Sequence, residues 1–322
     1  MMLTINRYRG LLHGAALVAL STLVFSANGC SSNEPVQSTS EYTADENSAE
    51  DSTADRQGED AVAQTQVVYP ATNEDDYSVS PEWTLVWADE FEGEELNLEN
   101  WTRQILPEPY NDEWQQYFDR EENAYVEDGN LVLKAIHTGE EHAKGQYTSA
   151  RLHTGGKQTW TYGKIAARIQ LPYGQGIWPA FWMLGADIDE IGGSTPWPVC
   201  GEIDILELYG SRNDAVVEAN IHYDDDGHKM MGAEPYELES GIFADNFHVF
   251  EIEWNEKTIK WLVDGVEYHS TDISGESTDE FHGDFYILLN IAVGGQWAGR
   301  PDDTTPFPSL MYVDWVRVYQ QN

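Results

Sequence analysis

Basic residues are scarce in this chain of 322 residues. There are 17 Lys and Arg against 57 Asp and Glu, which gives a formal net charge of −40 at pH 7 and a pI of about 4.2. Phosphate groups are bound mainly by Lys and Arg, so this balance argues against nucleic acids and anionic membrane surfaces as partners. A neutral substrate fits the charge better.

Cysteine is nearly absent, with only Cys30 and Cys200. We expect no structural disulfide, and we expect Cys200 to be a lone buried thiol. The nine histidines show no His-Glu-x-x-His spacing, so a catalytic zinc is not expected and the chemistry should need no cofactor. The acidic segment 223–229 lacks the twelve-residue calcium-loop pattern, and we interpret it as a solvated turn.

A membrane-length apolar run is also missing. The apolar stretch 11–25 is only about fifteen residues long, which is short for a bilayer span. It follows Arg7 and Arg9 and precedes small residues, as in an export signal. Residues 1–29 resemble a bacterial lipoprotein signal peptide with Cys30 as the lipidated N-terminus, although Ala27 stands where that pattern usually has leucine.

Ser31 directly after the cysteine fits sorting to an outer membrane or the cell surface, and ordinary secretion is the alternative. Residues 30–81 are mostly Ser, Thr, Glu, Asp, Gln and Ala, and from residue 31 onward Arg56 is their only basic residue. This composition cannot bury enough apolar surface to offset the entropy of ordering, so it predicts a disordered acidic tether.

Residues 82–322 have a different character, with short apolar segments separated by turn signals. Asp264-Gly265 lies between two alternating runs and predicts a β-hairpin. No long helical period competes, so we predict a single all-β sandwich domain. Five segments have the length and composition of strands: 130–136, 164–171, 217–223, 248–254 and 312–319.

Three acids interrupt one apolar strand segment. In "EIDILE", Glu202 and Asp204 alternate onto one strand face, but Glu207 follows after three residues. A β-bulge between Asp204 and Glu207 would return all three acids to the same face. Retaining hydrolysis of a glycosidic bond uses two carboxyl groups about 5–5.5 Å apart, and a third between them can keep their titrations separate. The alternative is an edge strand whose charges only prevent aggregation.

The sequence from residue 83 to residue 320 resembles glycoside hydrolase family 16, in particular its laminarinases. The resemblance rests on the bulged Glu-x-Asp-x-x-Glu pattern and on five further segments. It implies a β-jelly-roll sandwich of two curved antiparallel sheets with a concave substrate cleft. It also implies that Glu202 is the nucleophile, Asp204 its helper and Glu207 the general acid/base. The five supporting segments are 86–102, 147–154, 162–185, 290–299 and 301–320.

The resemblance also suggests residues that bind sugar. Trp178 and Trp182 are four residues apart on a strand, so they share a face, and sugar stacking is weighed against core packing. Trp254, Trp261 and Trp315 lack such support and are expected to be structural. The other predicted substrate-binding residues are Trp197, Trp297 in a Gly-rich loop, His222, Arg151 and Asn290.

A structural calcium is a further implication of the resemblance. The matching positions are Glu90, the backbone of Gly129, and Asp314, which offer the oxygen ligands that calcium prefers. Surface acids and a hairpin glycine are the alternative reading of these positions.

Together these features predict a monomeric, exported, endo-acting and retaining β-1,3-glucanase that binds β-glucan and touches a membrane only through its lipid. One alternative is a same-family hydrolase of mixed-linkage glucan, agar or carrageenan. Mixed-linkage specialists commonly have an unbulged spacing, and an acidic cleft would repel sulfated polymers. Another alternative is a non-catalytic glucan-binding protein, although such relatives characteristically lose the acids.

Overall fold

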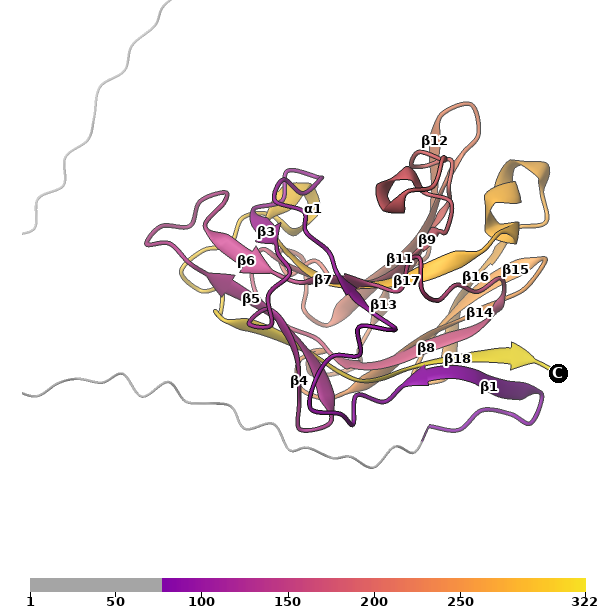
Figure 1. The fold of residues 1–322 in the computed structure, drawn as a ribbon, viewed down its shortest axis with the longest axis horizontal. Coiled ribbons are helices and arrows are strands. Elements are labelled where there is room, and N and C mark those ends of the chain that lie inside the picture. The colour runs from indigo at the N-terminus through magenta and orange to yellow at the C-terminus, as the bar shows by residue number, and fades with distance from the viewer. Residues whose placement is uncertain (1–76) are drawn as a thin grey trace, which may run out of the picture. The chain divides into compact units, whose positions relative to one another are not determined.

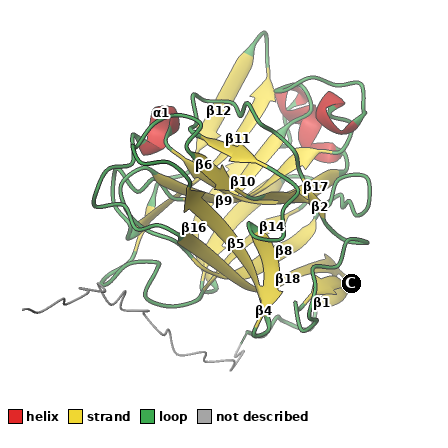
Figure 2. Cartoon of the chain, turned by 60° about the vertical axis from the view of Figure 1, so that its left-hand side comes forward, coloured by secondary structure: helices red, strands yellow, loops and turns green. Residues whose placement is uncertain are grey.

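The short apolar segments pair into two β-sheets that face each other across one hydrophobic core. The computed structural model describes residues 77–322, and strands dominate it (Figures 1 and 2). The predicted signal peptide, Cys30 and the tether up to residue 76 lie outside the described residues. The predicted all-β sandwich of antiparallel sheets is confirmed.

The larger sheet has ten strands, and it is antiparallel except for the parallel pair β3–β6. Its longest path runs in the order β16-β15-β14-β8-β18-β5-β6-β3, while β1 pairs with β18 and β4 with β5. The strands are β1 (Trp83–Asp89), β3 (Gln115–Tyr117), β4 (Ala124–Glu127), β5 (Asn130–His137), β6 (Tyr147–Ser149), β8 (Gly163–Gln170), β14 (His248–Trp254), β15 (Thr258–Val263), β16 (Val266–Asp272) and β18 (Ser309–Gln321).

The smaller sheet has eight strands in the order β12-β11-β10-β9-β17-β7-β2, with β13 paired to β11. These are β2 (Thr102–Arg103), β7 (Arg151–His153), β9 (Ile177–Gly185), β10 (Glu202–Glu207), β11 (Val216–Asp224), β12 (His228–Gly232), β13 (Tyr236–Glu237) and β17 (Phe285–Val293). The helices of the described residues are short: η1 (Asp189–Ile191), η2 (Glu276–His282) and α1 (Gly295–Ala298).

The core between the sheets explains why the strands alternate as they do. One large cluster of buried side chains contains Ile203 of β10 and Phe181 of β9 from the smaller sheet, and Phe250 of β14 and Trp261 of β15 from the larger one. The opposite face of the smaller sheet, which we call the site face, carries polar and aromatic side chains. The β11–β12 hairpin and α1 stand on that side (Figure 1).

Each predicted strand segment is found as a strand, with bounds that differ by at most a few residues. Asp264 and Gly265 connect β15 to β16, both with positive φ (50° and 75°), as a two-residue hairpin turn requires. The predicted hairpin is confirmed.

Tyr77, which the sequence assigns to the tether, packs on the outer face of the larger sheet. Its ring lies 5.0 Å from that of Trp315, and its hydroxyl donates to the buried carboxylate of Glu251. Cys200 is buried and free, as predicted, and burial raises the pKa of its thiol to about 12. Within residues 77–322, no helix has the length and apolar character needed to cross a membrane.

Candidate active site

A bulge in β10 turns its three acids to the site face. The pairing of β10 with both neighbouring strands shifts by one residue between Asp204 and Glu207. Ile205 and Leu206 are adjacent in sequence, yet both lie in the main core. Because the extra residue is absorbed there, Glu207 points to the same side as Glu202 and Asp204. The predicted bulge is confirmed.

The bulge is held from across the core. Trp261, on β15 of the larger sheet, is fully buried and donates its indole N–H to the backbone oxygen of Asp204 at 2.9 Å. The sequence marked Trp261 as structural, and its burial agrees. Its hydrogen bond, however, fixes the backbone of the strand that carries the acids.

Glu202 lies at the accessible end of the group, with 16% of its side chain exposed. Trp197 donates its indole N–H to Oε2 of Glu202 at 2.6 Å, and Nε2 of His222 lies 4.0 Å from Oε1. Burial raises the pKa of Glu202 well above its usual range, and the charge of Asp204 adds to this. His222 and the Trp197 N–H oppose the shift because they favour the carboxylate.

Asp204 is the middle acid and is almost fully buried, at 2% exposure. Its Oδ2 lies 3.2 Å from Nε2 of His222 but accepts no hydrogen bond. Burial, followed by the charge of Glu207, raises the pKa of Asp204 well above its usual range, and a hydrogen bond with Glu202 opposes this. The neutral acid is therefore favoured at this position.

Glu207 is buried but surrounded by donors. Oε1 accepts a hydrogen bond from Nε1 of Trp178 at 2.9 Å, and Oε2 accepts from the hydroxyl of Tyr209 at 2.9 Å and from Nδ2 of Asn220 at 3.3 Å. Burial raises the pKa of Glu207, whereas the Tyr209 and Trp178 donors lower it. This environment supports both the acid and the carboxylate form, which an acid/base catalyst must alternate between.

The three carboxyls interact as one titrating group. Charge on Glu207 raises the pKa values of both Glu202 and Asp204, because like charges in a dry environment disfavour one another. No Lys or Arg among residues 77–322 forms an ion pair with any of the three. Three interacting carboxyls retain protons to higher pH than isolated acids do. Each titration step then belongs to the three carboxyls together rather than to one residue.

Arg151, Trp182 and Asn290 come together beside the acids. Asn290 accepts a hydrogen bond from the Trp182 indole at 2.7 Å, and the Arg151 guanidinium lies 4.8 Å from the Trp182 ring centroid. Arg151 also pairs with Glu190 of η1 at 3.2 Å. The structure thus brings these three predicted residues into one preorganised wall, while their role in sugar binding stays a prediction.

Trp197 and His222 form a second wall, beside Glu202. Trp197 is 46% exposed, and its ring centroid lies 6.0 Å from that of His222. His228 joins them: its ring lies 4.6 Å from that of Trp197, and its Nε2 lies 2.9 Å from Nδ1 of His222. His228 belongs to the segment 223–229, for which the sequence predicts a solvated turn.

Trp178 and Trp297 pack against each other on the other side of Glu207. Their ring centroids are 5.5 Å apart, and Trp297 lies in the one-turn helix α1, 42% exposed. Trp178 is only 7% exposed; its ring also packs against that of Tyr209, and its indole N–H donates to Glu207. Stacking of Trp178 on a sugar stays a prediction, but the structure shows it chiefly as support for Glu207.

Several neighbours of the acids were not anticipated. Tyr209 and Asn220 contact Glu207 from positions that carry no motif of their own. His228 had a usable signal, because Asp226-Gly227 is a hairpin pair, and both residues have positive φ in the turn that folds β12 back on β11. The sequence around Trp261 carries no such signal, because no local pattern distinguishes the buried indole that will reach the bulge from the other buried indoles.

The predicted calcium ligands do not form a ready site in this arrangement. Glu90 binds Arg317 through two hydrogen bonds of 2.8 Å, and Asp314 pairs with Arg168 at 2.6 Å. Both carboxylates are therefore already neutralised by guanidinium groups, and an ion would have to displace them. Calcium binding stays a prediction.

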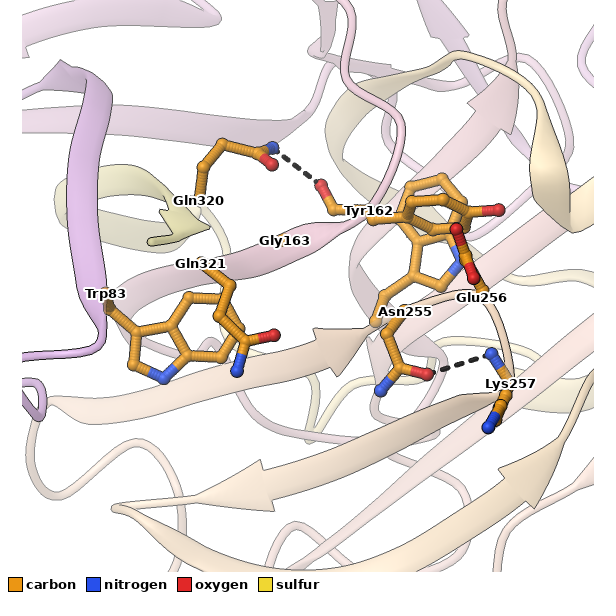
Figure 3. A pocket seen from close by; sticks show the side chains of 9 residues that line it. Trp83, Tyr162, Gly163, Asn255, Glu256, Lys257, Gln320 and Gln321 are labelled. Carbon is orange, nitrogen blue, oxygen red and sulfur yellow. Dashed lines mark hydrogen bonds between the residues drawn. The ribbon is translucent and has the colours of Figure 1, made fainter.

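A pocket of about 340 Å³ lies elsewhere, at one end of the larger sheet (Figure 3). Trp83, Tyr162 and Gln320 are among its lining residues, and Nε2 of Gln320 donates to the backbone oxygen of Tyr162 at 2.9 Å. None of the three acids lines it. The pocket is therefore separate from the site built on β10.

This chain is similar in sequence and in structure to several known proteins. The model of the family "Glycosyl hydrolases family 16" matches residues 111–317. A beta-glucanase from Rhodothermus marinus is 37% identical over 252 residues, which are 75% of this chain and 86% of that protein. The solved laminarinase catalytic domain from Thermotoga maritima is 40% identical, with a TM-score of 0.65, covering 75% of this chain and 99% of that one.

A clotting factor G alpha subunit from Tachypleus tridentatus is also similar, with 37% identity over 248 residues. These cover 76% of this chain but only 35% of that longer protein. Similar sequences therefore occur in proteins with differently described roles, and the arrangement of the site residues must carry the functional argument.

Proposed function

The chain belongs to glycosyl hydrolase family 16, and from this membership we propose that it is a monomeric, endo-acting and retaining β-1,3-glucanase. The observation that carries the proposal is the arrangement of Glu202, Asp204 and Glu207 side by side on the site face, each with different hydrogen-bond partners. A sheet edge charged only to prevent aggregation would not bury its acids in mutual contact.

In the first step, the Glu202 carboxylate attacks the anomeric carbon while the bond to the glycosidic oxygen breaks. Glu207 gives its proton to that oxygen, so the departing chain leaves as an alcohol and a glycosyl ester remains on Glu202. We assign Asp204 as the helper of Glu202, with which it shares a hydrogen bond. Its burial beside the other two acids helps to keep their titrations separate.

In the second step, water attacks the same carbon. Glu207, now ionised, takes a proton from the water, the new C–O bond forms, and Glu202 leaves as a carboxylate. The donors from Trp178, Tyr209 and Asn220 favour the ionised form that this step needs. Two inversions at one carbon retain its configuration.

The glucan chain would lie across the site face between the two aromatic walls. Trp182 with Arg151 and Asn290 forms one, and Trp197 with His222 forms the other. Flat rings beside fixed hydrogen-bonding groups suit a neutral polysaccharide, which the acidic character of the chain also favours.

The decisive test is E202Q, assayed by release of reducing sugar from laminarin. We expect less than roughly 1% of the wild-type rate, because glutamine cannot form the glycosyl ester. Proton NMR of the first products of the wild-type enzyme should show the β-anomer. A variant that retains more than a few per cent of the rate, or an initial α-anomer, would refute the mechanism.

Specificity is tested with a panel of laminarin, mixed-linkage β-glucan, agar and carrageenan. We expect the highest kcat/KM on laminarin, measured from the initial rate of reducing-sugar release on each polysaccharide. A higher value on a galactan would replace the proposed substrate without affecting the roles of the acids.

We further propose that the protein is exported and anchored by a lipid on Cys30, at the outer membrane or cell surface. The support comes from the sequence of residues 1–31. Fractionation of a bacterial host expressing the wild type and C30S is the test: the wild type should be in the membrane fraction and C30S should not. Equal distribution of the two would favour ordinary secretion.

A further inference from the structure

The acids share their site with an imidazole. Glu202, Asp204 and His222 each offer one possible ligand atom, and these three atoms lie within 4.8 Å of one another. Among residues 77–322, no other group of three His, Cys, Asp or Glu side chains converges in this way. Nε2 of His222 lies 3.2 Å from Oδ2 of Asp204 and 4.0 Å from Oε1 of Glu202.

These spacings approach those around a tetrahedral zinc ion. With metal–ligand bonds of about 2.0–2.1 Å, two ligands of such an ion lie roughly 3.4 Å apart. The spacing of 3.2 Å between Nε2 of His222 and Oδ2 of Asp204 already meets this value, and the longer spacings, at most 4.8 Å, must shorten by up to about 1.4 Å. One imidazole and two carboxylates form a ligand set suited to zinc, whereas calcium takes six to eight oxygens.

Two features of this group besides its spacing point to a ligand at this position. Oδ2 of Asp204 is buried, directed at His222, and accepts no hydrogen bond, so it has an unused lone pair. The other nitrogen of His222, Nδ1, lies 2.9 Å from Nε2 of His228. When Nδ1 donates to His228, Nε2 of His222 faces the carboxylates with a free lone pair, as in metal-bound histidines anchored by an outer partner.

We propose that Glu202, Asp204 and His222 form a binding site for a zinc-class divalent cation, anchored by His228, and that the bound ion excludes the substrate from the active site. The ion displaces the protons of the carboxylates and occupies lone pairs that catalysis requires. It takes no part in the reaction. The exclusion of substrate depends on the proposed function, whereas the metal site itself does not.

Binding is tested directly on the full chain. Titration calorimetry with ZnCl2 should show one ion per chain whose binding is lost in H222Q. With CoCl2, the visible absorption bands should be the intense ones of a four-coordinate ion. H228Q should weaken binding by about ten- to a hundredfold, as the loss of outer partners of metal ligands does.

The matched control is H269Q, which removes an imidazole on β16 whose Nε2 contacts the hydroxyl of Thr271 at 2.9 Å, outside the site. It should bind zinc like the wild type, and CaCl2 or MgCl2 should not compete. Melting curves without metal verify that each variant is folded. Zinc binding that H222Q leaves intact, or that H269Q weakens equally, would overturn the metal site.

Exclusion of substrate is tested by kinetics on laminarin. ZnCl2 should raise the apparent KM and leave kcat unchanged, because the ion and the glucan compete. A fall in kcat at constant KM would contradict competition. If the protein binds zinc as described but hydrolyses none of the glucans, the proposed function fails while the metal site stands.

Discussion

On the outer face of the larger sheet, buried and half-buried carboxylates lie against cations, whereas on the site face of the smaller sheet three carboxylates lie against one another. Lys164 contacts Glu251 at 3.5 Å and Glu253 at 3.1 Å. On the same face, Arg168 pairs with Asp314, and Arg317 pairs with Glu90. Within residues 77–322, His222 is the only basic side chain that lies within ion-pair distance of the acids of β10.

The contrast separates buried carboxylates that have a cationic partner from buried carboxylates that have none. A buried carboxylate is expensive unless it is paired, and the larger sheet meets this requirement on its outer face. On the site face, the three buried carboxylates of β10 have no Lys or Arg partner among the described residues. Groups kept in such an unfavourable environment are candidates for catalysis, because the same burial that costs stability shifts their pKa values.

The strongest test of this contrast compares E207Q with E251Q. Loss of the general acid in E207Q should lower kcat on laminarin by about 10²- to 10⁴-fold. On an aryl β-glucoside with a good leaving group, the first step needs no proton, so the burst of aryl alcohol should survive. E251Q should retain the wild-type kcat. Equal losses in both variants would contradict the separation of the two faces.

Removing a cation from the larger sheet should cost stability without affecting activity. K164M leaves the buried Glu251 without its lysine, and we expect a loss of about 3 kcal/mol in the free energy of unfolding, measured in urea. K260M is the matched control: Lys260 and Glu267 form an exposed pair, worth less than about 1 kcal/mol. An equal loss of unfolding free energy in K164M and K260M would show that burial of the ion pair does not determine its contribution to stability.

Trp261 connects the two regions, and its removal should affect both stability and activity. W261F removes the hydrogen bond to the backbone of Asp204, so we expect a loss of about 1–3 kcal/mol in stability. We also expect a fall in kcat as the bulge loosens. W254F is matched, because Trp254 is equally buried but donates to the backbone of Phe281. It should lose similar stability and keep its kcat.

The smallest expected effect is on the pH dependence of stability. The raised pKa of Asp204 means that the folded state binds its proton more tightly than the unfolded state does. Stability should therefore fall as pH rises from the unfolded pKa, about 3.8, through the raised folded one. D204N should make this decline above about pH 4 shallower, measured by urea denaturation at each pH.

Asp272 provides the control of opposite sign. It is exposed, and hydrogen bonds from Ser274 lower its pKa, so its contribution is lost only as pH falls below the usual range of an aspartate. D272N should leave the profile above about pH 4 unchanged. An identical change of slope in D204N and D272N would show that the slope does not come from the site.

Much of the site could be predicted because its signals are local. The spacing of Glu202, Asp204 and Glu207 predicts a bulge if all three acids share a face, since strand alternation places every second side chain on one face. The Asp264-Gly265 hairpin followed from the positive φ that such a turn needs. The contribution of His228 was missed although Asp226-Gly227 is the same kind of signal, because the acidic residues around it suggested a solvated turn.

Contacts between distant segments could not be predicted. Trp254 and Trp261 are alike in sequence as strand tryptophans, yet only Trp261 reaches the backbone of Asp204, 57 residues away. Likewise, Glu90 and Asp314 were assigned to calcium as oxygen donors, and their pairing with Arg317 and Arg168 depends on which strands became neighbours. Sequence spacing carries no information about such register.

The sequence by itself determined the all-β class, because short apolar segments separated by turn signals fill residues 82–322 and no long helical period competes. It also predicted the bulge and the shared face of the three acids, because these follow from side-chain alternation along a single strand. Only the tertiary structure decided which acid is buried most deeply, which donors surround Glu207, and which carboxylates gained a cation. These depend on packing between strands far apart in the chain. Burial and neighbouring charge, rather than residue type, then set the proton affinity of each acid.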